Sequence, residues 1–135
     1  MTWEDFCALG DDVHGEHVGG HLLVIPRGTF EHQNAADDFR AVLQGAGLVT
    51  VTEWAWRPPG TQREYQPDVV VLDRTPADPR VNWTGTAPTL VVGVTSPGDA
   101  SADWVRDVRD DARFGARHHW ILDHRDHALH AFAGR

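Results

Sequence analysis

The apolar positions of this chain follow two kinds of pattern. Residues 67–72 and 89–95 are runs of aliphatic side chains, and such runs are typical of central strands covered on both faces. Residues 31–44 place apolar side chains three and four positions apart, which predicts a helix with one buried face. Along the whole chain, these patterns and their alternating counterparts predict helices at 2–9, 31–44 and 102–114, a hairpin at 17–25, and strands at 48–56, 67–72, 89–95, 118–123 and 128–133.

Glycine and proline mark the boundaries of these elements. Gly19-Gly20 is a hairpin turn signal, and residues 73–86, rich in Pro and Asp, predict a loop. Within 48–56, alternation places Trp54 and Trp56 on one face of the predicted strand. The order of elements predicts an α/β fold with a central mixed β-sheet flanked by helices, formed by residues 1–135 as one domain. Pattern and length alone fit several folds of this class.

The charge of the chain narrows its chemistry. The formal net charge is −8, which argues against nucleic acid as a partner, because phosphate binding needs clustered cations. All 12 basic residues are arginine, and the chain contains no lysine. A lysine general base, Schiff base or phosphate-binding ammonium is therefore excluded.

Cysteine content and hydropathy place the chain in a broad class. Cys7 is the single cysteine, so an internal disulfide is excluded. It falls in a short amphipathic pattern with Trp3 and Phe6, which predicts a small buried side chain. No apolar run approaches the roughly 18 residues that span a bilayer, and the first residues do not resemble a signal peptide. We expect a cytoplasmic protein.

Six short segments, in order along the chain, carry a family resemblance. Pro67-Asp68 opens the run P-D-V-V-V-L, which is similar to the P-D-V-V-V strand of the Uma2 family, a branch of the PD-(D/E)XK restriction-endonuclease-like superfamily. The resemblance covers essentially the whole chain and implies the restriction-endonuclease-like fold. The segments are M-T-W-E-D-F at 1–6, G-E-H-V-G-G-H-L-L-V-I at 15–25, F-E-H-Q at 30–33, Q-P-D-V-V-V-L at 66–72, L-V-V-G-V-T-S-P at 90–97 and G-A-R-H-H-W-I-L-D at 115–123.

The resemblance also implies where a nuclease site would lie. Such sites hold Mg²⁺ between an Asp and a Glu on neighbouring strands, often with a lysine close by. Asp68 stands at the position of the metal-binding Asp. Gly93 stands at the position of the Glu and offers no ligand, and Thr95 occupies the lysine position of the E-x-K pattern. The resemblance therefore implies a degenerate site in which Asp68 is a vestigial metal ligand.

Other positions of the family pattern have also changed. His21 falls where the family has a further acid, whereas the earlier glutamate is kept as Glu16. Arg106 and Arg109 lie where relatives carry the lysine on the following helix, but arginine does not act as a base. One carboxylate with histidine suits a transition metal better than Mg²⁺, so His21 and Asp68, with His32, form a second candidate ligand set. Without such refilling, no cofactor is expected.

Three functions remain open from the sequence. The first is a pseudo-nuclease or a domain repurposed to bind a small molecule or a protein partner. The second is a Mg²⁺-dependent DNA endonuclease whose lost carboxylate is replaced by one of Glu16, Glu31, Glu53 and Glu64. The third is a different enzyme that uses His21 and Asp68 as an acid–base pair.

A pocket at the former nuclease site is common to these hypotheses. His21 and Asp68 would lie at its rim, and Trp83 is the tryptophan most open to ligand stacking. The exposed aromatic residues also allow a homodimer. The remaining residues predicted to line the pocket are Glu16, Gly93, Thr95, Arg106 and Arg109.

Overall fold

The computed structural model of the chain describes residues 1–10, 15–24, 29–95, 109–110, 112–123 and 128–133. Over this part of the chain, the predicted order of helices and strands is confirmed, except that one strand is divided and a short strand is added. The elements are α1 (Trp3–Ala8), β1 (Gly15–Val18), β2 (His21–Val24), α2 (Phe30–Gly45), β3 (Val49–Thr52), β4 (Ala55–Trp56), β5 (Val69–Leu72), β6 (Trp83–Thr84), β7 (Leu90–Thr95), β8 (His118–Asp123) and β9 (Ala128–Ala133).

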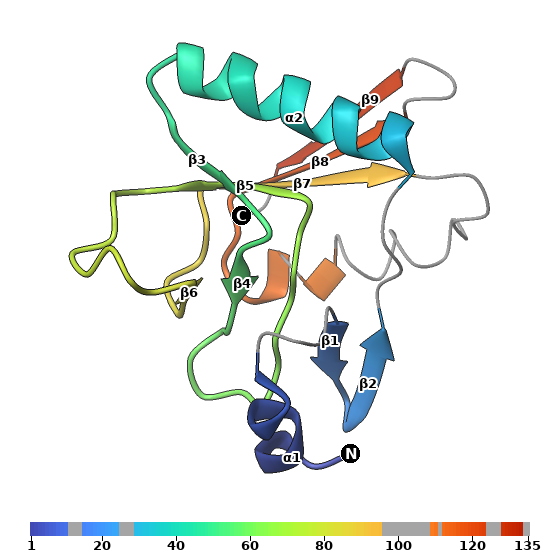
Figure 1. The fold of residues 1–135 in the computed structure, drawn as a ribbon, viewed down its shortest axis with the longest axis vertical. Helices are drawn as coiled ribbons and strands as arrows, with labels where there is room; N and C mark the ends of the chain where they lie inside the picture. Colours follow the sequence, from blue (N-terminus) through green and yellow to red (C-terminus); the bar gives the residue numbers. More distant parts are fainter. Residues whose placement is uncertain (11–14, 25–28, 96–108, 111, 124–127, 134–135) are drawn as a thin grey trace.

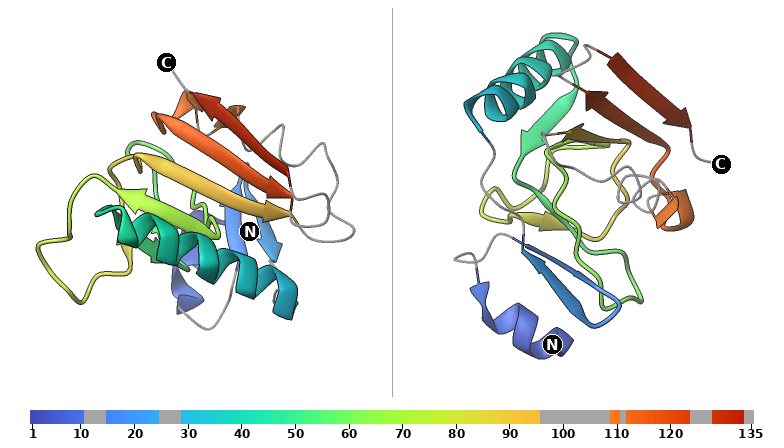
Figure 2. Two further views of the ribbon diagram at one scale, coloured as in Figure 1. Left: turned by 90° about the horizontal axis from the view of Figure 1, so that it is seen from above. Right: turned by 90° about the vertical axis from the view of Figure 1, so that its right-hand side faces the viewer.

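The main sheet has five strands in the order β3-β5-β7-β8-β9. It is mixed, because β7 and β8 run parallel while the other neighbouring pairs are antiparallel. Helix α2 lies along one face of the sheet, as Figure 1 and the view from above in Figure 2 show. The predicted class, a mixed sheet flanked by helices, is confirmed.

The core lies on both faces of the central strands. Every residue of β5 is buried, as its continuous apolar run predicts. On the face away from α2, Val70 packs against Trp54, and Val91 packs against Trp56. On the α2 face, the buried cluster consists of Ala36, Leu43, Val69, Val71, Leu90, Val92 and Val94.

Helix α1 and the β1–β2 hairpin lie together, away from the five-stranded sheet (Figure 1). The imidazole of His17 is buried, with its ring centroid 5.4 Å from that of Trp3 and 5.2 Å from that of Phe6. The backbone of His17 also pairs with Glu64 in both directions, at 3.1 Å each way. These contacts fix the hairpin and α1 to the segment that leads into β5.

The prediction of one continuous strand over 48–56 is wrong. Glu53 has a φ of 54°, and it is the one non-glycine residue with positive φ in the described part of the chain. The chain turns there, so β3 joins the main sheet while β4 pairs in parallel with β6. Trp54 and Trp56 are both buried, but Trp54 lies between β3 and β4, so the two do not belong to one strand and they pack in different core clusters. The predicted loop at 73–86 likewise contains β6 near its end.

Two further predictions concern the burial of Cys7 and the helix at 102–114. Cys7 is exposed, so its prediction as a buried side chain is wrong: Phe6 fills the buried position of the six-residue helix α1. Of the helix predicted at 102–114, residues 109–110 and 112–113 are helical, and 102–108 with 111 lie outside the described residues. None of the helices in the described ranges is long and apolar enough to cross a bilayer.

Candidate functional site

Asp68 stands directly before β5, after a proline. Its Oδ2 accepts the backbone N–H of Val94 at 2.7 Å. The antiparallel register pairs Val69 with Val92, and one further step along it sets Asp68 opposite Gly93. Asp68 and Gly93 therefore hold the neighbouring-strand positions that the family resemblance assigns to the two metal-binding acids.

His32 reaches Asp68 from the first turn of α2. Thr29 caps this helix by accepting the N–H of His32 at 3.2 Å. The Nε2 atom of His32 lies 3.1 Å from the carbonyl oxygen of Val94 and 3.4 Å from Oδ1 of Asp68. Because a carbonyl oxygen only accepts, the contact with Val94 assigns a proton to Nε2. The imidazole thus donates to the carbonyl oxygen of Val94, where the end of β7 meets the first turn of α2.

Gly93 leaves open space beside this carboxylate. A Cβ atom placed on Gly93 would meet no described atom within 4 Å, and its φ is not in the left-handed region. Neither crowding nor backbone conformation requires glycine here. Among the described residues, therefore, nothing requires glycine at this point of β7, and its effect on the site is the absence of a side chain.

The remaining predicted site residues are dispersed. His21 is exposed beside the Gly19-Gly20 turn, and this end of the hairpin points away from the five-stranded sheet in Figure 1. No hydrogen bond or ion pair joins His21 to Asp68. Arg109 is exposed, while Arg106 and the side chain of Thr95 lie outside the described residues. The structure brings His32 to Asp68, and it does not bring His21 there.

Glu16 acts on the segment that carries Asp68. Its Oε2 accepts the backbone N–H of Gln66 at 2.8 Å. A carboxylate that binds a backbone amide is held in one place, and it restrains the two residues before Asp68. The structure thus places Glu16 beside the approach to β5.

The fit of a metal ion can be judged from the donor groups. Within the described ranges, no three His, Cys, Asp or Glu side chains converge as metal ligands. Asp68 and His32 supply two groups, and one oxygen of Asp68 is already bonded to Val94. Mg²⁺ prefers several oxygen ligands in octahedral geometry. These residues alone do not fit a Mg²⁺ site.

A buried polar cluster, not predicted from the sequence, lies beside Phe114. The hydroxyl of Tyr65 donates to Oδ2 of Asp110 at 3.1 Å and accepts from Nη1 of Arg63 at 3.2 Å. Burial, opposed by the hydrogen bond from Arg63 and assisted by the negative charge of Asp110, raises the pKa of Tyr65 to about 12. The phenol stays protonated at neutral pH and anchors the helical residues after 108 to the segment before β5.

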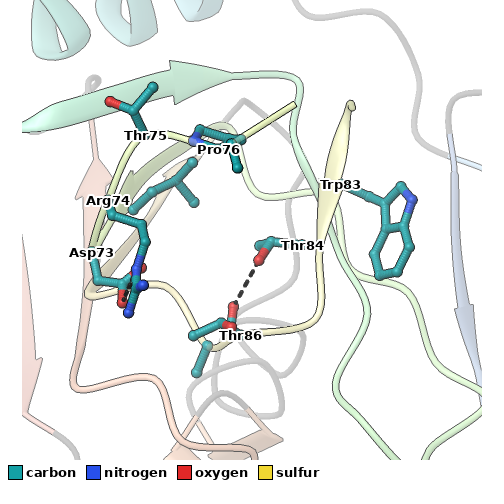
Figure 3. Close-up of a pocket in the computed structure, with 10 residues that line it drawn as sticks. Asp73, Arg74, Thr75, Pro76, Trp83, Thr84 and Thr86 are labelled. Atoms are coloured by element: carbon teal, nitrogen blue, oxygen red, sulfur yellow. Dashed lines mark hydrogen bonds and ion pairs between the residues drawn. The ribbon is translucent and has the colours of Figure 1, made fainter. Parts of the chain in front are cut away.

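Trp83 lies beside a small cavity but does not face into it. A cavity of about 170 Å³ is enclosed by the loop after β5 and the turn after β6. In Figure 3 the Trp83 indole points away from Thr84 and Thr86, out of this ring of chain. The indole lies instead near the guanidinium of Arg57, with 5.2 Å between the guanidinium carbon and the ring centroid. Trp83 is 44% exposed.

Comparison with known proteins defines the class of the molecule. A solved structure described as "a putative nuclease belonging to DUF820", from Anabaena variabilis ATCC 29413, matches with a TM-score of 0.84 at 15% sequence identity, covering 100% of this chain and 80% of that chain. At this identity the match shows the fold, which is that of restriction-endonuclease-like proteins.

The family follows from the sequence. The model of the Uma2 family, described as "Putative restriction endonuclease", matches residues 3–135, and the chain belongs to this family. No curated protein matches the chain.

Proposed function

We propose that this chain is a Uma2 protein that has lost metal-dependent DNA cleavage and retains the fold to bind a small molecule or a protein partner. The observation that carries this proposal is the pairing of Asp68 with Gly93. The one acid at the family's metal position faces a residue without a side chain, and that acid bonds to Val94 instead.

Two properties of the whole chain support the same conclusion. It contains no lysine that could orient a water or stabilise the charge that develops on phosphate. Its net charge of −8 opposes the approach of a DNA backbone, whose binding relies on cationic side chains. Glycine in place of glutamate at position 93 also reduces the negative charge of the site and opens space, which suits an uncharged ligand.

A plasmid-nicking assay with Mg²⁺ or Mn²⁺ tests the loss of cleavage. We expect the wild type to leave supercoiled plasmid intact. Asp68→Asn, and Asp37→Asn as a control at an exposed acid with the same change of charge, should behave identically. Cleavage that disappears in Asp68→Asn but persists in Asp37→Asn would refute the proposal.

The second candidate is a Mg²⁺-dependent endonuclease with a relocated carboxylate. Glu16 is the strongest candidate for this carboxylate. Its side chain accepts the backbone N–H of Gln66, two residues before Asp68. If cleavage is found, its loss in Glu16→Gln as well as in Asp68→Asn would identify this arrangement. The acid–base pairing of His21 with Asp68 gains no support from the exposed position of His21.

Partner binding stays a separate prediction. The homodimer and the cytoplasmic location expected from the sequence are likewise proposals that do not depend on the loss of cleavage. Light scattering of the purified protein over a range of concentrations would measure whether two copies associate.

A further inference from the structure

A second, larger cavity is lined by residues of α1 and by Gln66. Asp68 is not among its lining residues. Its volume is about 270 Å³. Phe6 and Leu9, on α1 and at its end, give it an apolar wall beside the thiol of Cys7. Glu53 and Glu64 are among its polar lining residues. The cavity therefore joins an apolar surface to carboxylates.

Glu64 is a buried and fixed anion in this lining. It is 4% exposed, and its Oε1 accepts from Nε of Arg57 at 2.7 Å while its Oε2 accepts from Nε2 of Gln66 at 3.0 Å. The guanidinium carbon of Arg57 lies 5.6 Å from the ring centroid of Trp3 and 5.2 Å from that of Trp83. Arg57, the one cation among the described lining residues, is thus already committed to Glu64 and to two indole rings.

Glu53 supplies a negative charge that no described residue neutralises. Its side chain makes no hydrogen bond or ion pair with another described residue, and it is exposed at the cavity. Its backbone has a φ of 54°, a conformation that costs a non-glycine residue about 1–2 kcal/mol. The pairing of β4 with β6 sets this turn, and Glu53 lines the cavity from it.

We propose that this cavity binds a small organic cation, a guanidinium or primary ammonium group on a short apolar stem. The cation would bind Glu53, next to the outer lone pairs of Glu64, and the stem would lie against Phe6 and Leu9. The described lining residues carry two carboxylates and one guanidinium, and this net charge favours a cation over an anion. A metal ion suits it less, because no three metal-ligating side chains converge among the described residues.

Cys7 offers a direct measure of occupancy, since it is the single thiol and it lines the cavity. N-ethylmaleimide is neutral, but it reacts with the thiolate of Cys7, which a nearby bound cation favours, so slowing by a cation reports shielding of the thiol by the ligand. We expect n-butylguanidinium to slow this reaction in a saturable manner at constant ionic strength. Its neutral counterpart n-butylurea should give no saturable slowing. Calorimetric titration of the same two compounds checks that the slowing reports binding.

Two variants separate this binding from general effects of charge. Glu53→Gln should weaken the binding of n-butylguanidinium about fivefold, the loss expected for one partly exposed ion pair. Glu31→Gln, which makes the same change on α2, should leave the binding constant unchanged. Equal protection by n-butylurea, no saturation with n-butylguanidinium, or unaltered binding in Glu53→Gln would overturn the proposal. Because Asp68 takes no part, the outcome is independent of the plasmid-nicking assay.

Discussion

The carboxylate of Asp68 and the backbone amide of Val94 lie 2.7 Å apart, in a hydrogen bond between a side chain and the neighbouring strand. In this position the acid extends the pairing of β5 with β7 beyond the last residues that pair through their backbones. Asp68 therefore has a structural task that does not depend on any metal ion. This task predicts effects on stability that a free catalytic acid would not have.

Replacement of Asp68 by alanine should lower the free energy of unfolding by about 1–2 kcal/mol, because the N–H of buried Val94 loses its acceptor. Asp68→Asn keeps an acceptor oxygen at the same place and should lose less than half as much. Urea denaturation monitored by tryptophan fluorescence measures both. Equal losses in the two variants would show that the hydrogen bond to Val94 contributes nothing.

Introduction of glutamate at Gly93 should create a metal site. The space beside Gly93 accepts a Cβ, so Gly93→Glu should change the free energy of unfolding by no more than about 1 kcal/mol. With two carboxylates on adjacent strands, Mn²⁺ should bind at least tenfold more tightly than to the wild type, as calorimetry would show. Gly93→Gln is the matched neutral control. Equal Mn²⁺ binding by the Glu and Gln variants would contradict the assignment of this position.

Tyr65 should titrate far above its ordinary range. It is the single tyrosine, so the near-ultraviolet absorbance of tyrosinate reports it alone. Its pKa of about 12 in the folded protein exceeds the ordinary value of 10.0, so the stability it contributes is complete below pH 10 and is lost between pH 10 and 12. Tyr65→Phe should be less stable at neutral pH by about 1 kcal/mol but should lack this alkaline loss. A midpoint near pH 10 in the folded protein would contradict the burial of the hydroxyl.

Glu53→Gly should stabilise the protein. Glycine adopts the φ of 54° without strain. The free energy gained by removing the strain exceeds the free-energy cost of the greater entropy of glycine in the unfolded chain by about 0.5–1 kcal/mol. Glu53→Ala removes the same charge without relieving the backbone, and it serves as the control. Thermal unfolding compares the two, and a lower midpoint for the glycine variant than for the alanine variant would show that position 53 is not strained.

Elements with a strong local signal could be predicted from the sequence. The aliphatic runs of β5 and β7 and the helical spacing of α2 depend on neighbouring residues, and all three were confirmed within two residues or so at each end. The turn at Glu53 could not be predicted, because no glycine or proline marks it. It exists because Ala55 pairs with Trp83, which is remote in the sequence. Tertiary pairing there overrides the alternation of the strand.

The candidate site was predictable in part for the same reason. Asp68 and Gly93 follow from one strand motif each, and the register sets them opposite one another. The contact of His32 with Asp68 depends on where α2 begins relative to the end of β7, a distance that no local pattern encodes. His21 was grouped with them through the family pattern alone. It is the first residue of β2, beside the turn of the hairpin.

The open space beside Gly93 also bears on the history of the chain. A glycine codon that ends in a purine becomes a glutamate codon through a single transition at its middle base. No described atom lies within 4 Å of a Cβ placed at Gly93, so the described residues do not oppose the first atom of the new side chain. On the proposed function, such a change restores the second acid but neither a lysine nor the acid replaced by His21, so the lost cleavage is not recovered by a single substitution.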